Sequence, residues 1–248
     1  MLTVDIGNTN IKWALWDGEA IIHSGSFAYS KQQVQQAFSN WHELRPGGQV
    51  MVACVAGEAV ETALTDWMRV HWSLTPVFLR STARFGDVIN AYPDPTQYGV
   101  DRWAALLGAR TLTHQPVCII DAGTAITVDL VGADGRHKGG LIMPGLQMMR
   151  EALMRGTAGI DQTSGNIRVF ADNTADAVSS GTLHMLRAAI IDICSSAANV
   201  LGNNMKIIIT GGMSEPIVSL AGMPDMQIEP NLVLLGLRAV ALSQTIEE

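Results

Sequence analysis

Cysteines, long apolar runs and metal-ligand spacings are all scarce in this chain. Its three cysteines, Cys54, Cys118 and Cys194, lie far apart within apolar stretches, which predicts buried, reduced thiols rather than ligands or nucleophiles. The six histidines are too widely spaced for a zinc motif. No uncharged apolar stretch reaches the length of about 18 residues that a membrane-spanning helix requires, so we expect no membrane partner.

Basic residues are also few, and they form no run. Sixteen Lys and Arg residues against 23 Asp and Glu residues give a formal net charge of −7. Proteins that bind nucleic acid through its phosphates concentrate lysine and arginine, so the sequence predicts no nucleic-acid partner. No basic and apolar leader precedes the strand-like residues that begin at Leu2, and the cytoplasm is therefore the expected location.

Apolar residues, in contrast, are abundant and make up 48% of the 248 residues. Short strand-like runs alternate with segments of helical spacing, a pattern typical of α/β proteins. Strands are predicted near residues 2–4, 50–55, 117–120 and 206–210, and helices near residues 31–41, 59–70, 101–112, 174–201 and 232–243. Two copies of one motif favour two similar halves, which we expect at residues 1–112 and 113–248.

The repeated motif occurs as DIGNTNIKWALWDG at residues 5–18 and as DAGTAITVDLVGADG at residues 121–135. In each copy an aspartate ends an apolar strand, glycine follows two residues later, and an Asp-Gly pair ends the next strand. Such a turn exposes backbone N–H groups and small polar side chains that suit phosphate oxygens, and its aspartate can hold a hydrated cation. Because the sequence has no G-x-x-x-x-G-K-[ST] motif, the two copies predict two half-sites for one nucleotide phosphate chain.

Several residues around these motifs have two interpretations. Lys12 follows the first turn and either contacts a phosphate or is a solvated strand residue. Thr124 and Thr127 add hydroxyl groups to the second turn. Two glycine pairs, Gly139-Gly140 and Gly211-Gly212, either allow close approach of the backbone to a ligand or form ordinary turns.

A third segment, YPDPTQYGVDRW at residues 92–103, follows a long stretch without clear periodicity. Its Asp101 lies at the start of a predicted helix, where aspartate is a common N-cap. A carboxylate beside the guanidinium of Arg102 is also what a phosphoryl-transfer site needs to orient an acceptor hydroxyl. The residues alone leave both interpretations open.

Together these motifs resemble the type III pantothenate kinases, a family of the acetate and sugar kinase, heat-shock ATPase and actin superfamily. Four signatures occur in order along nearly the whole chain: DIGNTNIK at 5–12, YGVDRW at 98–103, DAGTAITVD at 121–129 and GGLIMPG at 139–145. The resemblance implies two similar actin-like (ribonuclease H-like) α/β half-domains with a nucleotide cleft between them. It also implies ATP-dependent phosphorylation of pantothenate to 4′-phosphopantothenate, the first step of coenzyme A biosynthesis.

The resemblance further implies roles for individual residues. Asp101 would be the general base, Asp5 would act on the Mg²⁺ shell of ATP, and Asp121 would bind a monovalent cation, K⁺ or NH₄⁺. Homodimers with the acceptor site at their interface are implied, so that Thr174 would approach pantothenate from the neighbouring half or subunit. The residues implied to bind pantothenate are Tyr92, Gly99, Val100, Asp101, Arg102 and Thr174. Those implied to bind ATP are Asp5, Ile6, Gly7, Asn8, Thr9, Asn10, Ile11, Lys12 and Thr124.

One segment departs from the family's pattern, because GTAGIDQTSGN at 156–166 lacks an expected Leu-Pro near residues 159–160. The departure concerns local loop geometry rather than catalysis. Two other functions remain: a kinase of the same superfamily for a sugar or carboxylate, and a non-catalytic regulatory factor with the same fold. The segment at 92–102 favours pantothenate over other acceptors, and the intact Asp5 and Asp101 favour an enzyme.

Overall fold

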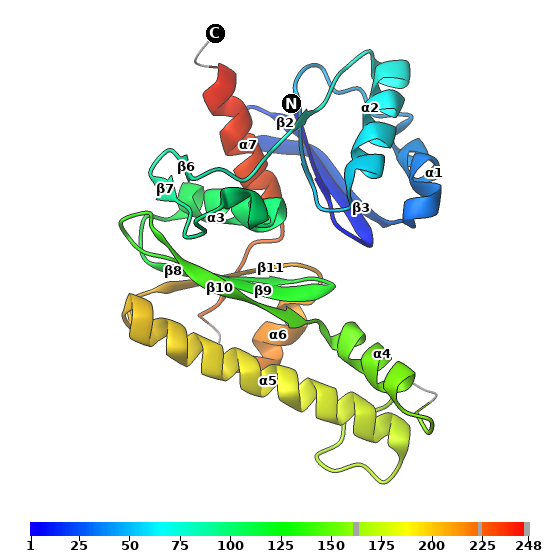
Figure 1. Cartoon of the computed structure of the whole chain (residues 1–248), viewed down its shortest axis with the longest axis vertical. Coiled ribbons are helices and arrows are strands. Elements are labelled where there is room, and N and C mark those ends of the chain that lie inside the picture. The colour runs from blue at the N-terminus through cyan, green and yellow to red at the C-terminus, as the bar shows by residue number, and fades with distance from the viewer. Residues whose placement is uncertain (161–163, 223–224, 246–248) are drawn as a thin grey trace. The chain divides into compact units, whose positions relative to one another are not determined.

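The computed structural model describes residues 1–160, 164–222 and 225–245, and the chain forms two compact units. Unit 1 comprises residues 1–114, 134–137 and 231–248, and unit 2 comprises residues 115–133 and 138–230. Each unit contains one five-stranded sheet, and Figure 1 shows the course of the chain through both units. Within the described residues, no helix is long and apolar enough to cross a membrane.

The sheet of unit 1 has the strand order β3-β2-β1-β4-β5. Its strands are β1 (Leu2–Ile6), β2 (Asn10–Asp17), β3 (Ala20–Ala28), β4 (Val50–Cys54) and β5 (Val77–Phe78). The first three strands form an antiparallel meander, whereas β4 pairs parallel with both β1 and β5. Side chains alternate between the two faces of a strand, so the apolar Leu2, Val4 and Ile6 share one buried face.

Helices cover both faces of this sheet. The face of Leu2, Val4 and Ile6 packs against α1 (Val34–Phe38) and α2 (Glu58–Trp72), and the opposite face packs against α3 (Val100–Leu112) and α7 (Leu232–Thr245) (Figure 1).

The α3 and α7 helices approach each other so closely that only glycine fits at their crossing. A Cβ atom added to Gly108 would lie 2.1 Å from the Leu232 carbonyl oxygen, and one added to Gly236 would lie 1.9 Å from the Ala104 carbonyl oxygen. The two glycines therefore let the backbones of the helices pack directly.

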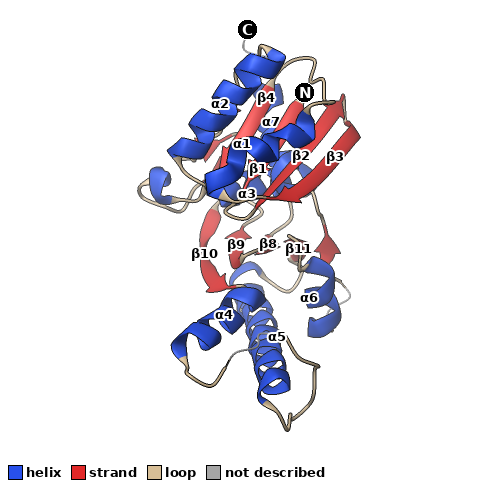
Figure 2. Cartoon of the chain, turned by 90° about the vertical axis from the view of Figure 1, so that its right-hand side faces the viewer, coloured by secondary structure: helices blue, strands red, loops and turns tan. Residues whose placement is uncertain are grey.

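The sheet of unit 2 repeats the same order, β10-β9-β8-β11-β12. Its strands are β8 (Val117–Ala122), β9 (Ala125–Val131), β10 (His137–Pro144), β11 (Lys206–Thr210) and β12 (Gln227–Ile228). The long helix α5 (Thr174–Leu201) and the short helix α6 (Ser214–Ala221) bury one face of this sheet, and α4 (Leu146–Gly156) packs against α5. Figure 2 shows α5 and α6 together on that face.

The repeated motif of the sequence is therefore a repeated topology, as predicted. In both copies the Asp-Gly pair turns the chain into the third strand with glycine in the left-handed region, at φ +57° for Gly18 and +73° for Gly135. The three cysteines are buried and reduced, also as predicted. Burial raises the pKa of the Cys118 thiol well above its ordinary value, as expected for a structural residue.

Two expectations about local structure need correction, and one helix was not expected. Residues 31–41 do not form one helix but a short α1 between two 3₁₀ turns, since few apolar residues in this polar stretch are available for burial. Residues 80–100 are not structureless: they contain the two-stranded β6 (Arg84–Phe85) and β7 (Val88–Ile89) and a 3₁₀ turn at Pro95–Gln97. The sequence also gave no expectation of α6.

The expected halves at 1–112 and 113–248 differ from the two units at two places. The last helix, α7, belongs to unit 1, because Gly236 packs on α3 and Arg238 donates hydrogen bonds of 3.0 and 3.1 Å to the Gly18 carbonyl oxygen. The turn at residues 134–137 also belongs to unit 1, because the N–H of Ile89 donates to the Gly135 carbonyl oxygen at 3.0 Å. Both contacts join residues distant in sequence, which no local pattern reveals.

Candidate active site

The first Asp-x-Gly turn, which follows Asp5, joins β1 to β2 in unit 1. Ile6 pairs with Ile11, so residues 7–10 form the turn, and the N–H of Gly7 donates to the Asn10 carbonyl oxygen at 3.0 Å. The three residues after Gly7 are exposed. The turn thus presents polar residues to solvent, as the sequence predicts.

Asp5 and Lys12 are direct neighbours across this hairpin. They are in register in the antiparallel pair, so their side chains lie on the same face of the sheet, with Cβ atoms about 5 Å apart in typical pairs of this kind. Both side chains are half-buried. The first turn therefore combines a carboxylate with an ammonium group at its base.

Tyr29 fixes the first turn from below, a contact that the sequence did not suggest. Its hydroxyl donates a 2.7 Å hydrogen bond to the Gly7 carbonyl oxygen, and its own N–H donates to the Thr9 carbonyl oxygen at 3.0 Å. Burial raises the pKa of Tyr29 to about 12, and the nearby Cys54 and Asp5 act in the same direction. The hydroxyl therefore stays protonated and keeps donating well above neutral pH.

The second turn joins β8 to β9 in unit 2 and is one residue shorter. Ala122 pairs with Ile126, so residues 123–125 form the turn, and the N–H of Gly123 donates to the Ala125 carbonyl oxygen at 3.1 Å. Asp121 is in register with Thr127 on one side and with Thr210 on the other. The second aspartate therefore lies between two hydroxyl-bearing residues on one face of the sheet, where the first has a lysine.

Two glycines allow the backbone to pack tightly around the second turn. A Cβ atom at Gly145 would lie 2.3 Å from the Thr124 carbonyl oxygen, whose bond from the Gly145 N–H measures 3.1 Å. A Cβ atom at Gly211 would lie 2.7 Å from Oδ1 of Asp121, and Gly211 has φ +91°. Gly145 and Gly211 are thus packed against the protein's own second turn. The interpretation of the glycine pairs as places of close approach to a ligand stays a prediction.

The segment at residues 92–103 forms a second group of polar residues in unit 1. Gly99 is the N-cap of α3, and its backbone supplies the cap without a side chain. Asp101 lies in the first turn of the helix, and its Oδ1 accepts a 2.7 Å hydrogen bond from the N–H of Arg102. Asp101 is therefore not the N-cap, and its carboxylate is held in one orientation by the neighbouring backbone.

Arg102 is buried, with 6% of its surface exposed, and lies among aromatic rings. Its guanidinium carbon is 4.7 Å from the centre of the Tyr98 ring, and Nη1 donates to the Tyr92 hydroxyl at 3.4 Å. Desolvation of a cation is costly unless partners compensate, and a ring face is one such partner. The arrangement therefore places a buried guanidinium beside two tyrosine side chains.

Thr174, by contrast, belongs to unit 2 and is exposed at the first position of α5. The preceding Asn173 caps the helix by accepting a 2.9 Å hydrogen bond from the N–H of Asp176. A cavity of about 580 Å³ opens beside Thr174. It is lined by Leu153, Ile160, Ala171, Asp172, Asn173, Thr174, Ala177 and Val178. Part of the segment that lacks Leu-Pro, residues 161–163, lies outside the described residues.

Comparison with known proteins identifies the family. The family model for type III pantothenate kinase matches residues 1–196. A type III pantothenate kinase of Nitrosococcus oceani is 36% identical over 249 aligned residues, which cover 97% of this chain and 93% of the relative. The chain belongs to the type III pantothenate kinase family.

Solved structures support the actin-like fold at lower sequence identity. A Campylobacter jejuni protein named for the Baf family of transcriptional activators matches with a TM-score of 0.62 at 19% identity, over 99% of each chain. A glucokinase of the ROK family from Streptomyces griseus, solved with glucose and AMPPNP, matches with a TM-score of 0.51 at 13% identity, over 97% of this chain and 98% of that one. At these identities the likeness concerns the fold alone.

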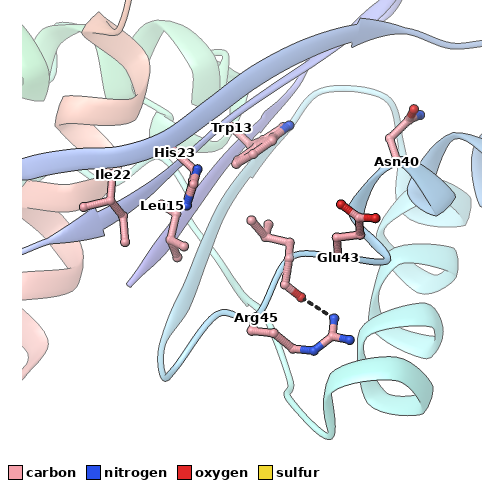
Figure 3. Close-up of a pocket in the computed structure, with 8 residues that line it drawn as sticks. Trp13, Leu15, Ile22, His23, Asn40, Glu43 and Arg45 are labelled. Carbon is pink, nitrogen blue, oxygen red and sulfur yellow. Dashed lines mark hydrogen bonds between the residues drawn. The ribbon is translucent and has the colours of Figure 1, made fainter.

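Unit 1 has a further cavity of about 450 Å³ (Figure 3). Trp13 and Leu15 of β2 form one wall, and Glu43 and Arg45 form part of the other. Neighbouring residues of a strand point to opposite faces, so this cavity is on the opposite face of the sheet from Lys12 and Asp5. This cavity is therefore separate from the Asp5 and Lys12 pair of the first turn.

Proposed function

We propose that this chain catalyses ATP-dependent phosphorylation of pantothenate to 4′-phosphopantothenate, the first step of coenzyme A biosynthesis, in the cytoplasm. Family membership supports the reaction. The observation that carries the assignment of residues is the arrangement at the start of α3, where Asp101 and the buried Arg102 lie in the first turn after the N-cap Gly99. A carboxylate and a guanidinium at a helix N-terminus suit an acceptor that has both a hydroxyl and an anionic group.

In the proposed reaction, the two Asp-x-Gly turns at residues 7–10 and 123–125 bind the phosphate chain of one ATP molecule. Phosphoryl transfer passes through a loose transition state, so positioning and neutralisation of charge do most of the catalytic work. The exposed turn at residues 7–10 offers backbone N–H groups and polar side chains, and Lys12 offers a positive charge. Thr124 offers the corresponding contacts from the second turn.

The chemistry of the two aspartates fits cations of different kinds. Mg²⁺ bound with ATP would be held through the carboxylate of Asp5, directly or through water, and would neutralise phosphate charge. A monovalent cation, K⁺ or NH₄⁺, would be held by Asp121. The hydroxyl-bearing Thr127 and Thr210 in register with Asp121 make an all-oxygen environment, which suits a hard cation of this kind.

Asp101 is the proposed general base for the primary hydroxyl of pantothenate. Its Oδ1 is oriented by the N–H of Arg102, which fixes the carboxylate relative to the helix. An aspartate is a weak base, but the loose transition state requires only a late proton acceptor. Arg102, with Tyr92, would bind the pantothenate carboxylate, and the backbone of Gly99 and Val100 would line the same site.

The proposed active form is a homodimer in which Thr174 contributes to an acceptor site. The segment before α5 carries three exposed apolar residues: Ile167 at 53%, Val169 at 79% and Phe170 at 96% of their surface. The backbone of this segment is nevertheless fixed, because the N–H of Arg168 donates to Oγ of Ser180 at 2.9 Å. Side chains of this kind on a fixed backbone favour a covered surface, and a second copy of the chain would cover it.

The first experiment measures formation of phosphorylated pantothenate from ATP and Mg²⁺ in potassium and in sodium buffer. We expect activity that rises with potassium. In the same assay, Asp101→Asn should lower kcat by about 10²- to 10⁴-fold, the usual contribution of a positioned general base. The matched control is Asp94→Asn, which alters a carboxylate of the same segment that bonds only Thr96 and Gln97 in the structure.

Three results would contradict parts of the proposal. Wild-type turnover in Asp101→Asn would remove Asp101 from the mechanism. Activity that is the same in both buffers would remove the monovalent cation. A folded wild type that leaves pantothenate unchanged would favour another acceptor or a regulatory role.

A further inference from the structure

His137 is a buried residue that the sequence motifs do not include, yet it lies against the proposed acceptor site. It is 5% exposed and begins β10, and it is the last residue of the 134–137 turn that belongs to unit 1. It is separated from the segment at 92–103 by the whole of α3 and two strands. Its position is therefore a product of the fold rather than of local sequence.

The imidazole of His137 touches both tyrosines of the acceptor segment. Its ring is stacked with that of Tyr92, with centres 6.3 Å apart and planes 6° from parallel. Its centre is 5.0 Å from that of Tyr98 at an angle of 46°. The two tyrosine rings are themselves 4.9 Å apart. The three rings form one packed group, which we call the His137 cluster.

The same imidazole holds the backbone next to Tyr92. Nδ1 of His137 accepts a hydrogen bond from the N–H of Ala91 at 3.4 Å. The following N–H, that of Tyr92, donates to Oδ1 of Asn90 at 3.0 Å, and Asn90 is in turn bound to the Thr82 carbonyl oxygen. Two consecutive backbone N–H groups are thus fixed by side chains, which sets the direction in which Tyr92 projects.

Arg102 is held by the two residues that His137 contacts. Its guanidinium lies over the Tyr98 ring and donates to the Tyr92 hydroxyl. If the His137 ring is removed, both tyrosines gain space to move, and the guanidinium loses a defined position. The Asp101 carboxylate accepts a hydrogen bond from the backbone of α3, at the N–H of Arg102.

We propose that His137 is a positioning residue for the acceptor, acting through Tyr92 and Tyr98 on Arg102. The proposal rests on the proposed function, because it takes Arg102 and Tyr92 as the groups that bind pantothenate. It assigns two separable parts to His137: ring packing against the tyrosines, and acceptance of the Ala91 N–H by Nδ1. In the neutral imidazole this acceptance leaves the proton on Nε2.

The experiment compares three variants of the full chain: His137→Ala, His137→Phe and His137→Asn. KM for pantothenate, KM for ATP and kcat are measured for each. We expect His137→Ala to raise KM for pantothenate by about 10-fold or more, since a displacement of about 1 Å in a binding group can cost up to about 100-fold. KM for ATP should change by less than about twofold, because the proposed phosphate contacts lie in the two turns.

The two conservative variants test the two parts. His137→Phe keeps a ring against the tyrosines, and His137→Asn keeps an oxygen acceptor close to the place of Nδ1. Each should restore part of the affinity for pantothenate that His137→Ala loses. The matched control is His23→Ala, which removes an exposed imidazole of the same unit and should leave all three constants unchanged.

Several outcomes would overturn the proposal. A purely structural role of His137 would lower the apparent kcat in proportion to the loss of folded protein seen by circular dichroism and leave both KM values unchanged. Unchanged KM for pantothenate in all three variants would also overturn it while leaving the proposed function intact. If His137→Ala fails to fold, the Phe and Asn variants decide by the same criterion. Absence of pantothenate turnover by the wild type would overturn the function and this proposal together.

Discussion

The two Asp-x-Gly turns, which follow Asp5 and Asp121, share a topology but differ in the residues that face these aspartates. In the first turn Asp5 faces Lys12 across the hairpin, and in the second Asp121 faces Thr127 and Thr210. In the proposed function, Lys12 adds a positive charge for phosphate beside the aspartate proposed for Mg²⁺. Thr127 and Thr210 add oxygen atoms beside the aspartate proposed for a monovalent cation. The proposal therefore gives the two turns different electrostatic roles through the residues opposite their aspartates.

The two turns also differ in how they are held. The first is one residue longer, and its Gly7 carbonyl oxygen is bound by the hydroxyl of Tyr29. The second has glycine packing, with Gly145 against the Thr124 carbonyl oxygen and Gly211 against Asp121. Side-chain support at one turn and glycine packing at the other predict different responses to mutation.

The largest difference between the turns should appear when each aspartate is neutralised. Asp5→Asn removes the proposed carboxylate near Mg²⁺, and we expect kcat/KM to fall by about 10³-fold, as for loss of a major electrostatic group. Asp121→Asn should instead weaken activation by potassium, with a smaller loss at saturating potassium. Titrating potassium at fixed ATP for both variants measures the contrast, and a normal potassium response in Asp121→Asn would assign the cation elsewhere.

The residues opposite the aspartates should give the next largest contrast. Lys12→Met removes the ammonium that faces Asp5. We expect KM for ATP to rise and kcat to fall, so that kcat/KM for ATP falls by about 10²-fold, as for one lost transition-state contact. Thr127→Val at the equivalent place should change these constants by less than about 10-fold. Equal losses in the two variants would show that the turns do not divide the charges. Lys31→Met, an exposed residue of the same unit, is the control.

Glycine packing should separate the two turns by stability as well as by activity. At Gly145 an added Cβ atom would lie 2.3 Å from a carbonyl oxygen, whereas at Gly7 the nearest atom would be 3.4 Å away. We therefore expect Gly145→Ala to lower the free energy of unfolding by about 1–3 kcal/mol, as overpacking does, and Gly7→Ala to lower it by less. Urea denaturation measures both, and a larger loss in Gly7→Ala would contradict the packing account.

The sequence predicted the repeated topology because each copy carries its own local signal. The aspartate, the glycine and the following Asp-Gly pair lie within one short segment of the chain, so their spacing is fixed by the local sequence. The proposed site residues Asp5, Lys12, Asp101 and Arg102 were chosen from such local signals and from the family resemblance. The structure places Asp101 and Arg102 where the motif put them, at the start of α3.

Contacts between distant segments were beyond prediction from the sequence. Tyr29 binds a carbonyl oxygen 22 positions earlier in the chain, and Ala91 is bound by a histidine 46 positions later. The membership of α7 in unit 1 depends on Gly236, which looks like any helix glycine until the crossing with α3 is seen. Two glycines facing each other on helices far apart in sequence are a signal only when the topology is known.

The smallest expected effect concerns the side-chain support of the first turn and depends on pH. The pKa of Tyr29 is raised to about 12 in the folded protein, above the value of about 10 expected for the unfolded chain. The contribution of protonated Tyr29 to the stability of the fold is therefore fully present below about pH 10 and is lost as the pH rises through about 12. Tyr29→Phe cannot ionise, so its unfolding temperature should fall less steeply between these pH values than that of the wild type.

Thermal unfolding of both proteins at intervals from pH 8 to pH 11.5 measures this difference. At pH 8 the variant should be less stable by about 1 kcal/mol, the usual net value of one hydrogen bond. Tyr92→Phe has no corresponding bond to a turn and serves as the control for loss of a hydroxyl. Parallel curves of unfolding temperature against pH for the wild type and Tyr29→Phe would show that Tyr29 does not hold the first turn. The proposed difference between side-chain support at the first turn and glycine packing at the second would then be wrong.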